Sequence, residues 1–546
     1  MEATQDSARR RRVTWRAGAT LISLAAALGA LAGTATAQAS ASRPAAAPGA
    51  STACTAQAIQ ATLHLAHVTV VSAATVTSGS YTPPGATPIT GLPAFCAAAL
   101  TQTDSAGNAI SIEAWLPAAW NGRFEGVGGG GYSCGISWSA LAGGIQSGYA
   151  TASTDCGVPA ADALTGQWGL TASNTLNWPL IDDFAYAGIH DMSVAGKAVA
   201  AGYYSHAPSY SYFDGCSTGG REGLMEAQRY PSDYNGIVSG APAINWTQFI
   251  PAELWPELVM KENNDYLPSC KEDAFTAAVV KACDKSDGIT NPFIADPADC
   301  HWSPSRLIGL VTPCGTITAT DARVMEQIWA GPATTGGKKL WYGLEPGASL
   351  SGLAGTVTSD GVTTPSPFPI TVAWLQDYLK QDPSWNWQTL TYSQFDQLFA
   401  QSVSEYSTTI ATNDPNLSQF KKDGGKILIW HGLADQLIFP QGTINYYQRV
   451  QQAMGGGEPT DSFARLFLAP GAQHCASAAG PAPANPLAAV VNWVEHGQAP
   501  ASILATVTDP ATGAVTLSRP LCAYPATAQY TGHGNTNDAS NFRCPS

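Results

Sequence analysis

Charged residues are scarce in this chain, and their balance excludes one class of partner. Asp, Glu, Lys and Arg make up 12% of the 546 residues, with 26 basic against 40 acidic side chains. The net charge of −14 argues against nucleic acid or an anionic membrane surface as a partner, because both would repel the protein. A hydrophobic content of 45% describes a compact globular protein with ample chain to bury a core.

Long apolar runs are also missing, except near the N-terminus. Residues 9–12 are all arginine, residues 21–31 are apolar, and Ala35-Thr36-Ala37 offers small side chains for cleavage. This order is typical of an export signal over residues 1–37, and the apolar run is too short to predict a membrane anchor. Residues 38–53 are rich in Ala, Ser and Pro and predict a disordered leader. We therefore expect a secreted, extracellular and soluble protein.

The cysteines lack any C-x-x-C spacing, which argues against a structural zinc site. Twelve cysteines in an exported chain imply disulfides instead. Spacing suggests the pairs Cys54–Cys96, Cys134–Cys156, Cys283–Cys300 and Cys522–Cys544, and it leaves Cys270, Cys314, Cys216 and Cys475 to be assigned.

Residues 210–229 contain the motif around which the prediction is built. Alternating aromatic residues predict a short strand, and the residues after Gly219 predict a helix. Between them, Gly215-x-Ser217-x-Gly219 is the pattern of a nucleophile elbow, a tight turn that exposes a serine hydroxyl. The free N–H groups of the helix N-terminus then face any developing anion. Alone this pattern is weak, because many glycine-rich turns contain it by accident.

The cysteine beside this serine strengthens the prediction. Cys216 precedes Ser217, and the only His-Cys dipeptide of the chain is His474-Cys475. A disulfide between these cysteines could bring the serine and the histidine together although they are distant in sequence. In the loop-entropy model, closing so long a loop stabilises the fold by about 4–5 kcal/mol. Cys270 and Cys314 would then form the sixth pair.

Other histidines compete for the role of base. His301 adjoins Cys300, so a link from Cys300 to Cys216 is an alternative, although its position far from any late strand disfavours it. His474 follows the last predicted strand, and Asp435 follows the strand before it, where the acid of an α/β-hydrolase triad belongs. An ordinary loop carboxylate is the alternative for Asp435. His431 is predicted either to line the substrate pocket or to be structural.

A glycine-rich loop at residues 126–132 follows the early strand predicted at residues 110–116. In α/β-hydrolases a loop at this place supplies half of the oxyanion hole. A phosphate-binding loop is disfavoured because no Gly-Lys-Ser/Thr follows, and a flexible linker is the other alternative.

Strand and helix patterns alternate on both sides of a long insertion, which predicts a parallel βαβ arrangement. The insertion, residues 243–423, is rich in Trp, Pro and Gly and lacks that alternation. Its position between serine and aspartate predicts a lid over the site. Its tryptophans either fill the lid core or together line an aromatic pocket. The predicted strands are residues 148–155, 236–242, 426–430 and 464–468, and the predicted helices are residues 185–201 and 486–496, the latter with Asn485 as N-cap and Gly497 as stop.

The Cys-Ser, Asp and His-Cys arrangement resembles the tannase and feruloyl esterase family, which includes MHETase-like enzymes, over nearly the whole mature chain. The resemblance implies an α/β-hydrolase fold in two parts, residues 54–242 and 424–546, around a large inserted lid domain at residues 243–423. It implies the following site: Ser217 as nucleophile, His474 as base, Asp435 as the acid that orients it, Gly130 or Gly131 and Thr218 as backbone donors of the oxyanion hole, and a Cys216–Cys475 disulfide that links nucleophile and base.

The resemblance also implies a structural Ca²⁺ in the lid. The segment from Cys283 to Phe293 packs oxygen ligands into a tight loop, although its spacing is not that of an EF-hand and by itself favours an acidic turn. This chain departs from the family pattern at Asn291, where an aspartate is common, and one lost charge should weaken binding. The implied ligands are the side chains of Asp284, Asp287 and Asn291 and the carbonyls of Ile289 and Phe293.

The implied activity is hydrolysis of esters of aromatic acids, with no organic cofactor. Feruloyl (hydroxycinnamoyl) esters are the first expectation, as small aromatic esters or as esters linked to plant polysaccharide. Gallate esters of tannins and the terephthalate monoester are the alternatives. Two hypotheses from other classes are a peptidase of the same fold and a non-catalytic, calcium-dependent extracellular binding protein.

Overall fold

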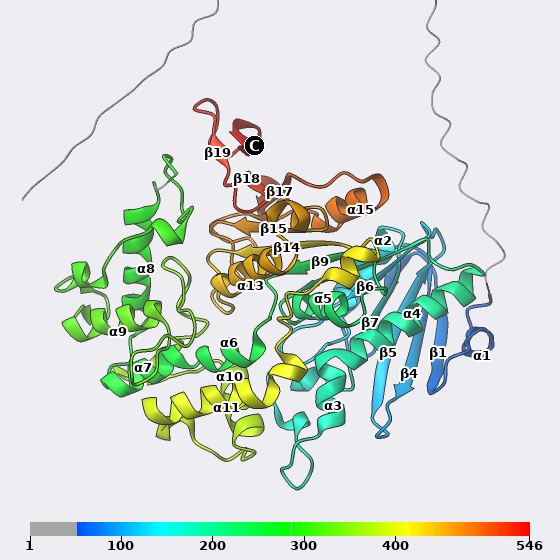
Figure 1. Ribbon diagram of the computed structural model, residues 1–546, viewed down its shortest axis with the longest axis horizontal. Helices are drawn as coiled ribbons and strands as arrows, with labels where there is room; N and C mark the ends of the chain where they lie inside the picture. The colour runs from blue at the N-terminus through cyan, green and yellow to red at the C-terminus, as the bar shows by residue number, and fades with distance from the viewer. Residues whose placement is uncertain (1–51, 286, 546) are drawn as a thin grey trace, which may run out of the picture. The chain divides into compact units, whose positions relative to one another are not determined.

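Nine strands form one central sheet in the computed structural model, which describes residues 52–285 and 287–545 (Figure 1). Their order is β1-β4-β5-β7-β6-β8-β9-β14-β15. Pairings from β1 to β7 in this order are antiparallel, and every pairing from β7 to β15 is parallel. The strands are β1 Val68–Val76, β4 Phe95–Thr103, β5 Ala109–Pro117, β6 Arg123–Val127, β7 Ala150–Thr154, β8 Tyr210–Cys216, β9 Gly236–Gly240, β14 Lys426–Gly432 and β15 Ala464–Ala469.

Helices cover both faces of this sheet. On one face, α4 (Gly188–Tyr204) packs Ile189, Met192 and Val199 onto the strands, at the three- and four-residue spacing that places side chains on one side of a helix. On the other face, Val490 of α15 packs against Val238 and Leu428. Parallel strands buried on both faces explain the near-continuous apolar runs of β9 and β14. The remaining helices here are α1 Ala56–Gln60, α2 Trp138–Gln146, α3 Trp178–Asp182, α5 Thr218–Arg229, α13 Pro440–Ala453, α14 Gly457–Asp461 and α15 Pro486–His496.

The predicted α/β fold is confirmed, including the parallel βαβ unit of β8, α5 and β9. The predicted cap of α15 is also present, because the Asn485 side chain accepts the N–H of Ala488 at 3.0 Å and Gly497 ends the helix at φ +69°. The helix expected over residues 185–201 lies further along the chain as α4, because a π-helical turn, Asp183–Ala187, precedes it.

The segment between β9 and β14 forms a group of helices to one side of the sheet (Figure 1). Its core is continuous with side chains beneath it, such as Tyr132 and Phe184. The helices are α6 Trp246–Ala252, α7 Trp255–Asn263, α8 Ser269–Cys283, α9 Ala319–Ala330, α10 Pro369–Ala373, α11 Tyr392–Ile410 and α12 Ser418–Lys422, and the hairpins are β10 Val311–Thr312 with β11 Gly315–Thr316 and β12 Thr356–Ser359 with β13 Val362–Pro365.

Three further small sheets complete the described strands. The C-terminal segment forms a sheet in the order β16-β17-β18, and a hairpin of β19 and β20 follows it. β2 and β3 pair antiparallel in the N-terminal part of the chain. The strands are β2 Gly79–Tyr81, β3 Ile89–Leu92, β16 Ala482–Pro483, β17 Ser502–Thr508, β18 Val515–Cys522, β19 Gln529–Tyr530 and β20 Phe542–Arg543.

Six disulfides link the cysteines, in the pairs that the sequence suggested. Cys300 pairs with Cys283, so it is not the partner of Cys216. Cys216 pairs with Cys475. The other pairs are Cys54–Cys96, Cys134–Cys156, Cys270–Cys314 and Cys522–Cys544.

The export signal predicted for residues 1–37, and the leader up to residue 51, lie outside the described residues. Within the described ranges, no helix combines the length and the apolar character that a membrane crossing requires.

Candidate active site

Ser217 occupies the sharp turn between β8 and α5. Its backbone has φ +64° and ψ −123°, a region that residues with a side chain rarely adopt. The turn also requires glycine at its flanks, because a Cβ on Gly215 would lie 2.5 Å from the backbone of Gly219. A Cβ on Gly128 would lie equally close to the Cα of Gly219, so the glycine-rich loop packs directly against the start of α5. The sequence pattern therefore forms the strained elbow that exposes a serine hydroxyl.

Two backbone N–H groups beside Ser217 are free to stabilise an anion. Within the described ranges, the N–H groups of Thr218 and Gly131 have no backbone acceptor, whereas Gly130 donates its N–H to the carbonyl of Ser133 at 2.9 Å. The Thr218 hydroxyl donates to the Gly131 carbonyl at 2.7 Å, which holds the two segments together. Of the two glycines named from the sequence, the geometry therefore favours Gly131 and leaves Gly130 engaged elsewhere.

Asp435 lies fully buried in the turn after β14. Its Oδ1 accepts hydrogen bonds from the backbone N–H groups of Leu437 and Ile438, both at 2.9 Å, and its Oδ2 accepts one from His474 Nδ1 at 2.9 Å. Burial alone would raise the pKa of this carboxyl, but the charge of His474 and the hydrogen bonds hold that pKa well below its usual range. Asp435 is therefore ionised and points at the imidazole.

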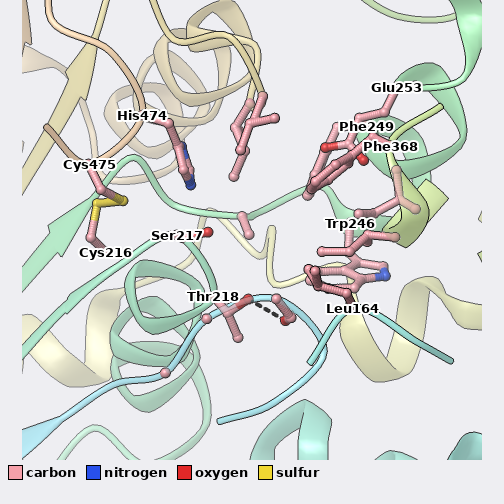
Figure 2. Close-up of a pocket in the computed structure, with 18 residues that line it drawn as sticks. Leu164, Cys216, Ser217, Thr218, Trp246, Phe249, Glu253, Phe368, His474 and Cys475 are labelled. Atoms are coloured by element: carbon pink, nitrogen blue, oxygen red, sulfur yellow. Dashed lines mark hydrogen bonds between the residues drawn. A yellow bond between two sulfur atoms is a disulfide. The ribbon is translucent and has the colours of Figure 1, made fainter. Parts of the chain in front are cut away.

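His474 presents its other ring nitrogen to the nucleophile. Because Nδ1 is hydrogen-bonded to Asp435, Nε2 is the nitrogen left to accept a proton. Figure 2 shows the ring pointing toward the Ser217 hydroxyl. Both residues line the same cavity. Burial lowers the pKa of His474, but the Asp435 charge and hydrogen bond raise it above the ordinary value of 6.5.

The disulfide between Cys216 and Cys475 joins the two loops directly. The cysteines are 259 residues apart in the chain, and their Cα atoms are 5.9 Å apart. Both line the same cavity as Ser217 and His474, and Figure 2 shows the sulfur bridge beside them. The structure thus brings together the serine, histidine and aspartate that the sequence singled out.

His431 does not line this cavity. It is fully buried beneath Asp435, and its Nε2 lies 3.1 Å from both Asp435 Oδ2 and the carbonyl of Ile438. Since both of those oxygens only accept, Nε2 is a donor to them, and Nδ1 is hydrogen-bonded to the Thr443 hydroxyl at 2.8 Å. The suggestion that His431 contacts substrate is wrong, because its ring lies behind the carboxylate and supports it.

The cavity has a volume of about 430 Å³ and mostly apolar walls. Trp246 is the only one of the eight tryptophans in residues 243–423 that lines it, so these tryptophans do not together line the pocket, and its other aromatic residues are Phe249 and Phe368. The other seven belong to the lid's buried core or pack against it, which was the alternative expected for them. For Phe249, Ile250 and Glu253, the three- and four-residue spacing from Trp246 along α6 was a usable signal. The lining residues that sequence reasoning missed are Leu164, Phe249, Ile250, Glu253, Phe368, Ile370, Leu437 and Ile438.

Two of the expected calcium ligands meet in the loop after α8. Asn291 donates its side-chain N–H groups to both carboxylate oxygens of Asp287, at 3.2 and 3.0 Å. The Arg519 side chain on β18 donates to the side-chain oxygen Oδ1 of Asn291 at 3.2 Å. Oxygen-only donors suit Ca²⁺, but the guanidinium adds a competing positive charge. The residues therefore fit a site of reduced strength.

The other expected ligands lie in the same segment. Asp284 is the C-cap of α8, Ile289 donates its N–H to Asp287 at 3.2 Å, and Phe293 is buried.

A second group of metal-ligating types, within the described residues, is His190, Glu226 and Asp233. Lys197 Nζ lies 3.1 Å from Asp233 Oδ1 and His190 Nδ1 lies 2.6 Å from its Oδ2. The positive charge of Lys197 already balances the negative charge of the Asp233 carboxylate, so this group is an ion-pair network.

Comparison with known proteins agrees with this geometry. The family model described as tannase and feruloyl esterase matches residues 96–545. A probable feruloyl esterase of Arthroderma benhamiae is 42% identical over 444 residues, which cover 80% of this chain and 82% of that protein. A probable feruloyl esterase B-1 of Aspergillus fumigatus is 30% identical over 515 residues, which cover 88% of this chain and 93% of that protein.

Solved structures give the same result. A tannin acyl hydrolase from Aspergillus niger superposes with a TM-score of 0.82 at 26% identity, covering 92% of this chain and 96% of its own. Feruloyl esterase B from Aspergillus oryzae superposes with a TM-score of 0.79 at 28% identity, covering 90% of this chain and 99% of its own. The chain therefore belongs to the tannase and feruloyl esterase family, with an α/β-hydrolase fold.

Proposed function

We propose that this protein is a secreted serine esterase that hydrolyses esters of aromatic acids, with hydroxycinnamoyl (feruloyl) esters as its main substrates. The observation that carries the proposal is the meeting of Ser217 and His474 on one apolar cavity, tied together through the cysteines beside them. Residues 243–423 act as the lid domain that roofs the cavity, between hydrolase segments at residues 54–242 and 424–546.

The proposed reaction uses the chain's own side chains. Ser217 Oγ attacks the ester carbonyl while His474 Nε2 takes its proton, and the protonated imidazole then gives that proton to the leaving alcohol. Asp435 holds His474 in the required tautomer and stabilises its positive charge. The N–H groups of Gly131 and Thr218 bind the oxyanion. Water, deprotonated by His474, then attacks the acyl-enzyme; the bond to Ser217 Oγ breaks, His474 returns the proton to Ser217, and the acid is released.

The cavity walls favour a flat, apolar acyl group. The rings of Trp246, Phe249 and Phe368 line the cavity beyond the nucleophile (Figure 2). Feruloyl esters come first because the two relatives named above are probable feruloyl esterases. Gallate esters come second because a structural neighbour is a tannin acyl hydrolase. Terephthalate monoesters are the third candidate.

The acyl specificity is testable with the parent protein and its Ser217→Ala variant. Methyl ferulate should be hydrolysed with a higher kcat/KM than methyl gallate or mono(2-hydroxyethyl) terephthalate, and Ser217→Ala should lower every rate by about 10⁴-fold or more. Product release measured by liquid chromatography gives these values. Ser209→Ala, an exposed serine outside the cavity, serves as control and should change nothing. A parent protein that cleaves none of these esters would refute the proposal.

The pH dependence follows from the Asp435–His474 pair. His474 must be neutral to accept the proton, and the pKa of His474 is raised, so kcat/KM should rise with pH through a midpoint above 6.5. Asp435→Asn should lower kcat by about 10⁴-fold. It should also move that midpoint down, because burial alone lowers the pKa of the imidazole. An Asp435→Asn profile with the parental midpoint would contradict this account.

We further propose that the loop from Asp284 to Phe293 binds Ca²⁺ weakly as a structural ion. Added Ca²⁺ should raise the melting temperature slightly, and Asn291→Asp should enlarge that shift, because it adds a negative charge to offset Arg519. Differential scanning calorimetry with Ca²⁺ or EDTA measures both. Asp273→Asn, an exposed acid on α8, is the control. Identical melting temperatures with Ca²⁺ and EDTA, in the parent and in Asn291→Asp, would exclude the site.

A further inference from the structure

Glu253 is the one carboxyl group that lines the active-site cavity among the described residues. It is the C-cap of α6, and its side chain is buried, with 2% of the residue exposed. Trp246, Phe249 and Ile250 lie on the same helix at spacings that place them on the same side, and they line the same cavity. Glu253 is thus the one polar side chain on the side of α6 that lines the cavity.

The Glu253 carboxyl is left without a partner. Its Oε2 is buried and makes no hydrogen bond to any described residue. An ionised carboxylate in such a place costs several kcal/mol. Burial, followed by the negative charge of Asp435, raises the pKa of Glu253 well above 4.5. Burial therefore favours the neutral carboxyl, which offers one O–H donor and one carbonyl acceptor.

The Glu253 carboxyl lies on the side of the cavity opposite the nucleophile. Figure 2 shows Glu253 across the cavity from Ser217, with Phe249 and Phe368 near it. An aromatic acyl group with its carbonyl at Ser217 would place its ring among these aromatic side chains. The ring substituents farthest from the ester would then face Glu253.

We propose that Glu253 recognises a hydroxyl group on the ring of the acyl half of the substrate. The inference rests on the proposed esterase function and deepens it. The carbonyl oxygen of Glu253 accepts a hydrogen bond from the phenolic hydroxyl, and its O–H donates one to the phenolic or an adjacent methoxyl oxygen. A ring without substituents would leave the buried carboxyl unpaired, and sites built in this way discriminate strongly against such analogues.

The test compares methyl ferulate with methyl cinnamate, which lacks the ring hydroxyl. The parent protein should favour ferulate in kcat/KM, and Glu253→Leu should lower kcat/KM for ferulate by about 10- to 100-fold while changing cinnamate by a few fold at most. Glu253→Gln keeps a donor and an acceptor and should retain most of the preference. An unchanged ferulate-to-cinnamate ratio in Glu253→Leu would overturn the inference.

Glu257→Leu is the matched control. Glu257 is also buried, with both carboxyl oxygens unpartnered, and burial raises the pKa of Glu257 to about 8, but it does not line the cavity. This variant should lose stability and keep the parental substrate ratio. If it altered the ratio as strongly as Glu253→Leu, the effect would come from the lid core and the inference would fail.

A binding measurement covers the case in which Glu253→Leu does not fold. Calorimetry with the Ser217→Ala variant should show methyl ferulate binding at least about 10-fold more tightly than methyl cinnamate. Equal affinities would overturn the role of Glu253 while leaving the esterase function intact. Failure of the parent protein to cleave either ester would instead refute the proposed function itself.

Discussion

The covalent link between Cys216 and Cys475 is the constraint on which the arrangement of the site depends. Ser217 lies on a strained elbow that its neighbouring strand and helix fix, whereas His474 lies in a loop behind the last strand of the sheet. That loop is also held by the Asp435 carboxylate, by Gln436, whose side chain accepts the backbone N–H of His474 at 3.1 Å, and by the Ala472 carbonyl, which accepts the Ala434 N–H at 3.0 Å. The bridge therefore limits how far the imidazole can move from the serine. In the chain-entropy model, the conformational entropy that this restriction costs is already lost in the cross-linked unfolded chain.

Buried polar groups hold the surroundings of the site in place. Arg221, fully buried on α5, donates to the carbonyls of Phe184 and Ala185 at 2.9 and 2.6 Å and lies over the ring of Trp246. It thus connects the elbow helix to the first lid helix. Asp435 receives donors from two backbone groups and two histidines, so its charge is stable although water is excluded. The fully paired carboxylate of Asp435 favours a preorganised site.

Sequence reasoning could predict features that depend on local chemistry. The elbow glycines and the Asn485 cap each follow from what a few neighbouring residues can do, and spacing suggested four of the six disulfides, whereas Cys216–Cys475 needed the motifs on both sides of the site. It could not choose between Gly130 and Gly131, because the choice depends on a turn in which Ser133 accepts one N–H. The place of His431 and the pocket role of Glu253 depend on packing between segments far apart in the chain, which no local pattern encodes.

The most direct test of the account is to remove the disulfide beside the nucleophile and measure catalysis in a folded protein. A Cys216→Ala/Cys475→Ala variant should keep the circular dichroism spectrum of the parent well below its melting temperature. Its kcat/KM should nevertheless fall by about 100-fold, the order expected when a catalytic base is displaced by roughly 1 Å. Cys522→Ala/Cys544→Ala, which removes a C-terminal bridge, should keep the parental kcat/KM. A folded Cys216→Ala/Cys475→Ala variant with parental kcat/KM would contradict the central claim.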